Sequence, residues 1–178
     1  MNASSPFRMM VHASLFAALT AAGAFIAIPI PFTPVPIVLQ NLFVLLTGVI
    51  LGPRWGLVSI GLYLFMGAMG FPVFAGGTGG FGRLFGPTGG YLLGYLPAVW
   101  VTGFICSRLG RTRTADILAM TAGALLVYAA GVPWLHAATG MDWSKALAAG
   151  MYPFLIGDAL KVGAGVLAAP IIRPLVKP

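Results

Sequence analysis

Asp158 and Lys161 are the two residues whose chemistry and spacing most need an explanation. They lie three positions apart in a long apolar segment, so a helix would place both side chains on one face. Charges inside such helices are costly and usually face a bundle interior or a cavity, often in pairs. A structural ion pair is the alternative, but a buried pair rarely offsets its own desolvation. The pattern therefore favours a functional site.

This pair combines an anionic acceptor with a cationic donor in a small volume. A ligand that carries N–H donors together with carbonyl or carboxylate acceptors would match both groups. Gln40 and Asn41 open another apolar segment and add two amides. Side-chain amides are costly there unless they are partnered, so they either bond a neighbouring helix or face a site. Both alternatives stay open.

Residues 74–91 form a glycine-dense connector in which Arg83 is the one charged residue. Glycine permits close backbone approach and positive φ, so such a run is typical of a built surface. A flexible linker is the simpler alternative, but Phe74, Phe81 and Tyr91 are among aromatic residues too closely interleaved for a solvated spacer. We therefore predict an ordered loop, including Gly77 and Gly79, that covers or lines a site.

The composition of the chain indicates which kind of secondary structure holds these residues in place. The chain has 178 residues, of which 59% are hydrophobic and 7% charged, and its mean hydropathy is +0.97. A soluble domain of this size cannot bury so much apolar surface. The apolar runs are continuous and do not alternate as in a β-barrel, so the spanning elements are helices of about 20 residues. We predict a single all-α transmembrane domain, a bundle with six spans at about residues 10–28, 37–51, 55–74, 89–109, 116–136 and 146–172.

The first span is expected to be retained and not to be a cleaved signal peptide, because no convincing cleavage site followed by a soluble domain is present. Its alanines recur at helical spacing and make a smooth face where another backbone can approach closely. Taken alone, this spacing more often indicates packing within the bundle. The alanines concerned are Ala13, Ala17, Ala18, Ala21 and Ala22.

The formal charge of +7 raises the possibility of nucleic-acid binding. However, the basic residues are scattered singly or in short groups at the ends of apolar segments, which is typical of membrane topology. Seven of them fall on the inner side if the N-terminus is cytoplasmic, against Arg83 and Lys145 outside. We therefore predict cytoplasmic N- and C-termini in a multi-pass protein of a bacterial-type cytoplasmic membrane, with residues 29–36 and the glycine-dense connector outside.

Several enzyme signatures are absent from the sequence. There is no Gly-Lys-Ser/Thr phosphate loop, so the chain cannot hydrolyse ATP by that route. It has no glutamate, its two histidines lie far apart, and Cys106 is its lone cysteine, so neither a metal site nor a hydrolytic triad is expected. Gly77-x-Gly79-x-x-Gly82 formally matches a dinucleotide fingerprint but lacks its strand-turn-helix context. No cofactor is predicted.

Five segments together resemble a known family. They are Val35-Pro-Ile-Val-Leu-Gln-Asn-Leu-Phe-Val-Leu-Leu, Leu51-Gly-Pro-Arg-Trp-Gly, Gly76-Gly-Thr-Gly-Gly, Gly86-Pro-Thr-Gly-Gly-Tyr-Leu and Gly157-Asp-Ala-Leu-Lys. The chain is similar to BioY, the biotin-binding S component of energy-coupling factor (ECF) vitamin transporters. The glycine-rich block combined with the late Asp-x-x-Lys makes the resemblance specific, and it spans almost the whole chain.

The resemblance implies a six-helix membrane bundle that binds biotin from the outer side. It also implies as partners a transmembrane coupling subunit and two cytoplasmic ATPases, which agrees with the missing phosphate loop. In S components an alanine-rich face of the first helix docks the coupling subunit, so the resemblance favours that role for the five alanines. Nucleic acid is not an expected partner.

The resemblance also assigns the polar pair to the ligand. Asp158 is expected to accept from the biotin ureido group and Lys161 to pair with an acceptor, although which end of biotin Lys161 meets stays open. Further substrate-binding candidates are Gln40, Asn41, Arg83, Tyr91, Gly77 and Gly79. The alternative for Arg83 is that it is a solvated charge of the outer loop with no role in binding.

Other functions stay open at this point. Within transport, the alternatives are a solitary biotin facilitator and an S component for a related small vitamin. A membrane enzyme with Asp158 and Lys161 as acid and base is disfavoured, because no further ionisable residue lies beside them in the sequence. A purely structural assembly subunit would use the alanine face and keep the polar pair as a packing device.

Overall fold

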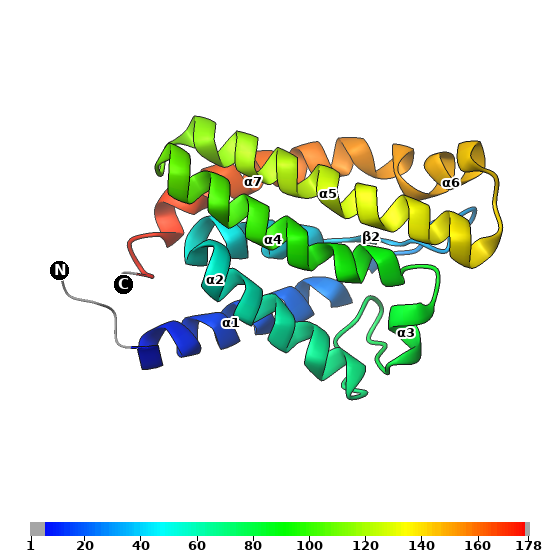
Figure 1. Ribbon diagram of the computed structural model, residues 1–178, viewed down its shortest axis with the longest axis horizontal. Helices are drawn as coiled ribbons and strands as arrows, with labels where there is room; N and C mark the ends of the chain where they lie inside the picture. Colours follow the sequence, from blue (N-terminus) through cyan, green and yellow to red (C-terminus); the bar gives the residue numbers. More distant parts are fainter. Residues whose placement is uncertain (1–5, 177–178) are drawn as a thin grey trace.

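The computed structural model describes residues 6–176, and its long helices run side by side along one axis (Figure 1). By length and composition, five of the described helical segments can cross a membrane, with α6 to α7 counted as one. The helices are α1 (Pro6–Phe25), α2 (Gln40–Ala68), α3 (Gly82–Phe85), α4 (Gly89–Leu109), α5 (Arg113–Thr139), α6 (Trp143–Gly150), the 3-10 turn η1 (Tyr152–Phe154) and α7 (Leu155–Ile172). Two short strands are β1 (Ala27–Ile28) and β2 (Ile37–Val38).

Helix α2 is a hairpin of two arms. Gly52 has φ 76° and ψ −177°, which is not helical, and Pro53 follows it. A Cβ on Gly56 would lie 3.7 Å from Gly48 Cα, whereas residues eight apart in a straight helix are separated by about 12 Å. The chain therefore reverses at Gly52, so α2 is two antiparallel arms and residues 6–176 form a bundle of six main helical segments, in agreement with the predicted fold class.

Small residues let the hairpin approach its neighbours closely. A Cβ on Gly48 would lie 2.7 Å from Val99 O of α4, and a Cβ on Gly103 would lie 2.5 Å from the Gly52 carbonyl carbon. Close backbone approach replaces part of the driving force that water supplies to soluble proteins, because lipid is as apolar as the side chains. Glycine at these contacts therefore joins α2 to α4.

The two helical arms of the hairpin are shorter than the spans predicted at residues 37–51 and 55–74. Ala27 pairs with Val38 and Ile28 with Ile37 in an antiparallel ribbon, so α1 stops at Phe25 and α2 starts at Gln40. The proline-rich residues 29–36 connect the two strands. At the other end, α2 stops at Ala68, and Phe74 turns back into the core, where it is 2% exposed. These changes build a cap of loops over one end of the bundle.

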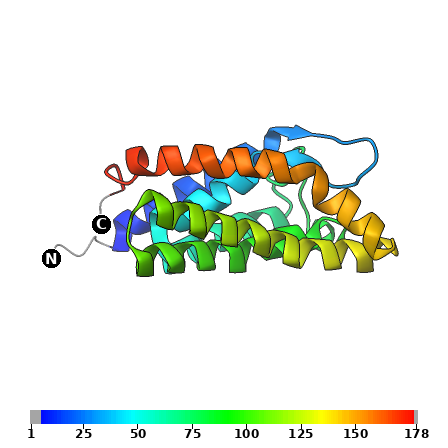
Figure 2. The same ribbon diagram turned by 90° about the horizontal axis from the view of Figure 1, so that it is seen from above.

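The last apolar segment is broken, where the sequence predicted one span over residues 146–172. Helix α6 ends at Gly150, and Pro153 lies in the 3-10 turn that precedes α7. Proline has no backbone N–H to continue the helix, so the chain changes direction here (Figure 2). As a result, Asp158 falls in the first turn of α7.

A buried ion pair lies at one end of the bundle. Helix α1 starts and α7 ends at the same end of the molecule, opposite α3 and α6 (Figure 1). At that end Arg173 forms an ion pair with Asp116, which is 0% exposed, and donates a 3.3 Å hydrogen bond to Arg111 O. The ion pair links the end of α7 to the start of α5.

The hairpin turn makes a test of the fold. Gly52→Ala is expected to lower the free energy of unfolding by about 1–3 kcal/mol, because its φ and ψ lie in a region that is open almost only to glycine. Gly61→Ala is the matched control, since a Cβ at either glycine meets nothing within 4 Å but Gly61 is helical. Thermal and denaturant unfolding in detergent measures both. Equal stability of the two variants would contradict the hairpin.

Candidate functional site

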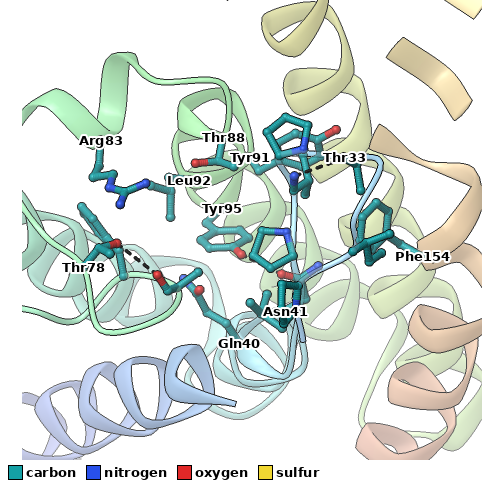
Figure 3. Close-up of a pocket in the computed structure, with 18 of the residues that line it drawn as sticks. Thr33, Gln40, Asn41, Thr78, Arg83, Thr88, Tyr91, Leu92, Tyr95 and Phe154 are labelled. Atoms are coloured by element: carbon teal, nitrogen blue, oxygen red, sulfur yellow. Dashed lines mark hydrogen bonds between the residues drawn. The ribbon is translucent and has the colours of Figure 1, made fainter. Parts of the chain in front are cut away.

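A cavity of about 290 Å³ lies beneath the cap of loops, near the lower end of the 300–1,000 Å³ that is typical of small-molecule pockets. Its walls come from residues 29–38, the start of α2, the glycine-dense connector, α4 and α5, with Lys161 from α7. Figure 3 shows Arg83 and Thr78 on one side of it and Phe154 on the other, with Tyr95 between them. Apolar walls with a few convergent polar groups suit a small organic ligand.

Three polar side chains at one side of the cavity link α7 to α5. Lys161 Nζ lies 2.7 Å from Asp158 Oδ1, and Tyr128 Oη donates a short hydrogen bond to Asp158 Oδ2. The side chains of Lys161 and Asp158 are only 11% and 10% exposed. Lys161 and Tyr128 line the cavity, whereas Asp158 does not and lies behind them. We call these three residues the Asp158 cluster.

Gln40 and Asn41 both bond a neighbouring segment and face the cavity, the two alternatives that the sequence left open. Gln40 Nε2 donates to Tyr63 Oη at 2.6 Å, and Asn41 Oδ1 accepts from Tyr95 Oη at 2.6 Å. Both amides also line the cavity. Tyr63 and Tyr95 therefore satisfy part of the hydrogen-bonding capacity of the two amides, and the remaining capacity is left for a ligand in the cavity.

Tyr91 contributes its ring to the cavity, while its hydroxyl group holds the scaffold. Tyr91 Oη donates to Gly150 O at 2.8 Å, at the end of α6. A Cβ on Gly131 would lie 2.3 Å from Tyr91 Cδ1, so the ring packs directly against the backbone of α5. Tyr91 thus joins α4, α5 and α6 beside the site.

The glycine-dense connector is an ordered loop, and only part of it reaches the cavity. Arg83 is exposed and also lines the cavity, so its guanidinium group lies at the mouth. Gly77 and Gly79 are not among the lining residues. A Cβ on Gly79 would lie 2.2 Å from Phe71 O, and Gly77 has φ +69°. In this structure these two glycines shape the loop and do not face the cavity.

Some lining residues were not among the sequence candidates. They are Thr33, Thr78 and Thr88 from the loops, and Tyr95 and Tyr128 from the helices. Tyr95 follows Tyr91 by one helical turn, and Tyr128 is a polar side chain in an apolar segment. The reasoning that singled out Asp158 applies to Tyr128 too, so a signal was present. Thr78 and Thr88 lie in the connector that was predicted to cover or line a site, whereas Thr33 had no signal of its own.

The alanines of α1 divide between two faces. Ala13 and Ala17 are 1% and 4% exposed and pack inside the chain, where Ser59 Oγ donates to Ala13 O at 2.8 Å. Ala21 is half-buried, whereas Ala18 and Ala22 are exposed. The exposed pair continues a line of small residues that starts at Ser14, which is also exposed. Only this part of the alanine face is open to another protein.

The family model named BioY matches residues 1–178. The chain belongs to the BioY family. A probable biotin transporter BioY of Pyrococcus horikoshii is 40% identical to it over 156 residues, which is 88% of this chain and 90% of that relative. A biotin transporter BioY of Thermotoga maritima is 38% identical, with 94% and 97% of the two chains covered.

A solved structure supports the same family. The crystal structure of the S-component for biotin from an ECF-type ABC transporter matches with a TM-score of 0.90 and 28% identity, covering 98% of this chain and 95% of that one. The helix arrangement described above is therefore that of a BioY-type S component, and the chain is a multi-pass membrane protein.

The buried pair makes a stability test. Lys161→Met keeps the aliphatic stem but leaves Asp158 without its counter-charge, so we expect a loss of about 3 kcal/mol in the free energy of unfolding. Asp158→Asn combined with Lys161→Met is expected to regain most of that loss, because no unpaired charge remains. Denaturant unfolding in detergent measures both. A Lys161→Met variant as stable as the wild type would show that the pair does not hold α7.

Proposed function

We propose that this chain is the biotin-capturing subunit of an ECF-type transporter. The observation that carries the proposal is the cavity that the Asp158 cluster closes at one side, in a chain with the fold of an S component for biotin. Biotin has a ureido ring with two N–H donors and one carbonyl, a fused thioether ring that forms its apolar body, and a carboxylate tail. The cavity offers groups that match each part.

The ureido ring would lie against the Asp158 cluster. Lys161 Nζ is a donor for the ureido carbonyl, while the acidic side of the cluster favours the N–H groups. The aromatic faces of Tyr95 and Phe154 and the side chain of Leu92 would contact the apolar body. Arg83 at the mouth would pair with the tail carboxylate, which assigns Lys161 to the ureido end.

Uptake energy would come from other subunits. The sequence has no phosphate loop, so ATP hydrolysis falls to two cytoplasmic ATPases and the force is transmitted by a transmembrane coupling subunit. The basic end of the bundle, with Arg54, Arg108 and Arg173, would face the cytoplasm. The cavity then opens outward, where it captures the vitamin.

Calorimetric titration of the detergent-purified chain with biotin tests the binding role. The wild type is expected to bind one biotin, and Lys161→Met to bind about 10- to 100-fold more weakly, because a charge-assisted hydrogen bond contributes about 1.5–3 kcal/mol. Lys145→Met is the control, since the Lys145 side chain is 74% exposed outside the cavity. No heat from a folded wild type would contradict the proposal.

A second test concerns the coupling subunit. We propose that it docks on the exposed line of Ser14, Ala18 and Ala22, since a small-residue face allows close helix approach. Ala18→Trp and Ala22→Trp are expected to abolish co-purification with co-expressed coupling and ATPase subunits, while biotin binding persists. Leu125→Trp on α5, at a position 57% exposed, is the control and is expected to assemble normally. Assembly that survives both α1 substitutions would exclude this face.

A further inference from the structure

Tyr128 stands between the buried carboxylate and the cavity. Its hydroxyl oxygen donates to Asp158 Oδ2, and the residue lines the cavity, whereas Asp158 does not. Asp158 Oδ1 already accepts a hydrogen bond from Lys161 Nζ at 2.7 Å. A ligand in the cavity therefore meets the tyrosine oxygen before it meets either carboxylate oxygen.

The direction of this hydrogen bond determines what Tyr128 offers. A hydroxyl group has one proton and two lone pairs, and a carboxylate only accepts. Because the proton of Tyr128 is given to Asp158, the tyrosine oxygen can only accept from the cavity. Hydrogen bonds in a chain polarise one another, so the negative charge of Asp158 strengthens the tyrosine oxygen as an acceptor.

The other polar groups at this side of the cavity are complementary to that acceptor. Lys161 has donors only. Asn41 Oδ1 accepts a hydrogen bond from Tyr95 Oη, so Asn41 keeps its Nδ2 donor for a ligand and Tyr95 keeps its oxygen lone pairs. The site thus sets two tyrosine acceptors beside two donors, which is the pattern that a cyclic urea requires.

We propose that Tyr128, and not Asp158 itself, accepts a ureido N–H of the ligand, and that Asp158 is a positioning residue acting through the Tyr128 hydroxyl. The inference rests on the proposed biotin-binding function. It assigns ligand selectivity for the N–H group to a residue of α5.

The experiment compares biotin with two isosteric analogues, cyclic carbamates in which one or the other ureido N–H is replaced by oxygen. Calorimetry is run on wild type, Tyr128→Phe and the control Tyr152→Phe, whose residue is 54% exposed and outside the cavity. Tyr128→Phe is expected to weaken biotin binding about 10- to 100-fold. One carbamate is expected to be weakened by a similar factor in wild type and hardly further in Tyr128→Phe, which is the coupling expected of direct contact.

A second pair of variants covers the case in which Tyr128→Phe is unstable because it leaves Asp158 Oδ2 unpartnered. Asp158→Asn together with Lys161→Met removes both charges of the pair, so this double variant with and without Tyr128→Phe isolates the hydroxyl group in a background without an unpaired charge. Here too, discrimination against that carbamate is expected only where the hydroxyl group is present.

Strictly additive losses for both carbamates, or wild-type biotin affinity in Tyr128→Phe, would overturn the inference while leaving biotin capture intact. A wild type that binds no biotin would overturn the proposed function and this inference together.

Discussion

The binding site of this structure depends on one buried carboxylate, that of Asp158. A buried charge is tolerated only when it is paired and hydrogen-bonded, and here the partners come from its own helix through Lys161 and from α5 through Tyr128. Satisfying the carboxylate therefore fixes how α7 sits against α5. The same contacts place a cationic donor and a hydroxyl group at the side of a cavity, so the structural requirement and the binding chemistry coincide.

Helix α7 depends on such polar contacts more than its neighbours do. Its buried residues are few, namely Asp158, Gly165, Val166 and Ala169. The Asp158 cluster holds one end, and the ion pair between Arg173 and Asp116 holds the other. Helices α2, α4 and α5 instead pack through glycine contacts. A ligand that exchanges hydrogen bonds with the Asp158 cluster thus acts on the helix that apolar packing holds least.

Much of this arrangement follows from local sequence features. Long apolar runs predict the spans, the short gap between the predicted spans 37–51 and 55–74 implies a hairpin, and spacing predicts that Asp158 and Lys161 share a face. What depends on contacts between distant segments was not predictable. Tyr128 meets Asp158 from another helix, and Ala13 is buried because α2 covers it. Helical spacing alone cannot tell which side of α1 faces a neighbour, nor that Asp158 lies behind its partners.

The decisive measurement is the crystal structure of the chain with biotin bound. We expect the ureido ring within hydrogen-bond distance, about 2.7–3.2 Å, of Lys161 Nζ and Tyr128 Oη, with the carboxylate tail directed toward Arg83. Biotin bound elsewhere, or bound in this cavity with its carboxylate on Lys161 and its ureido ring at the mouth, would contradict it.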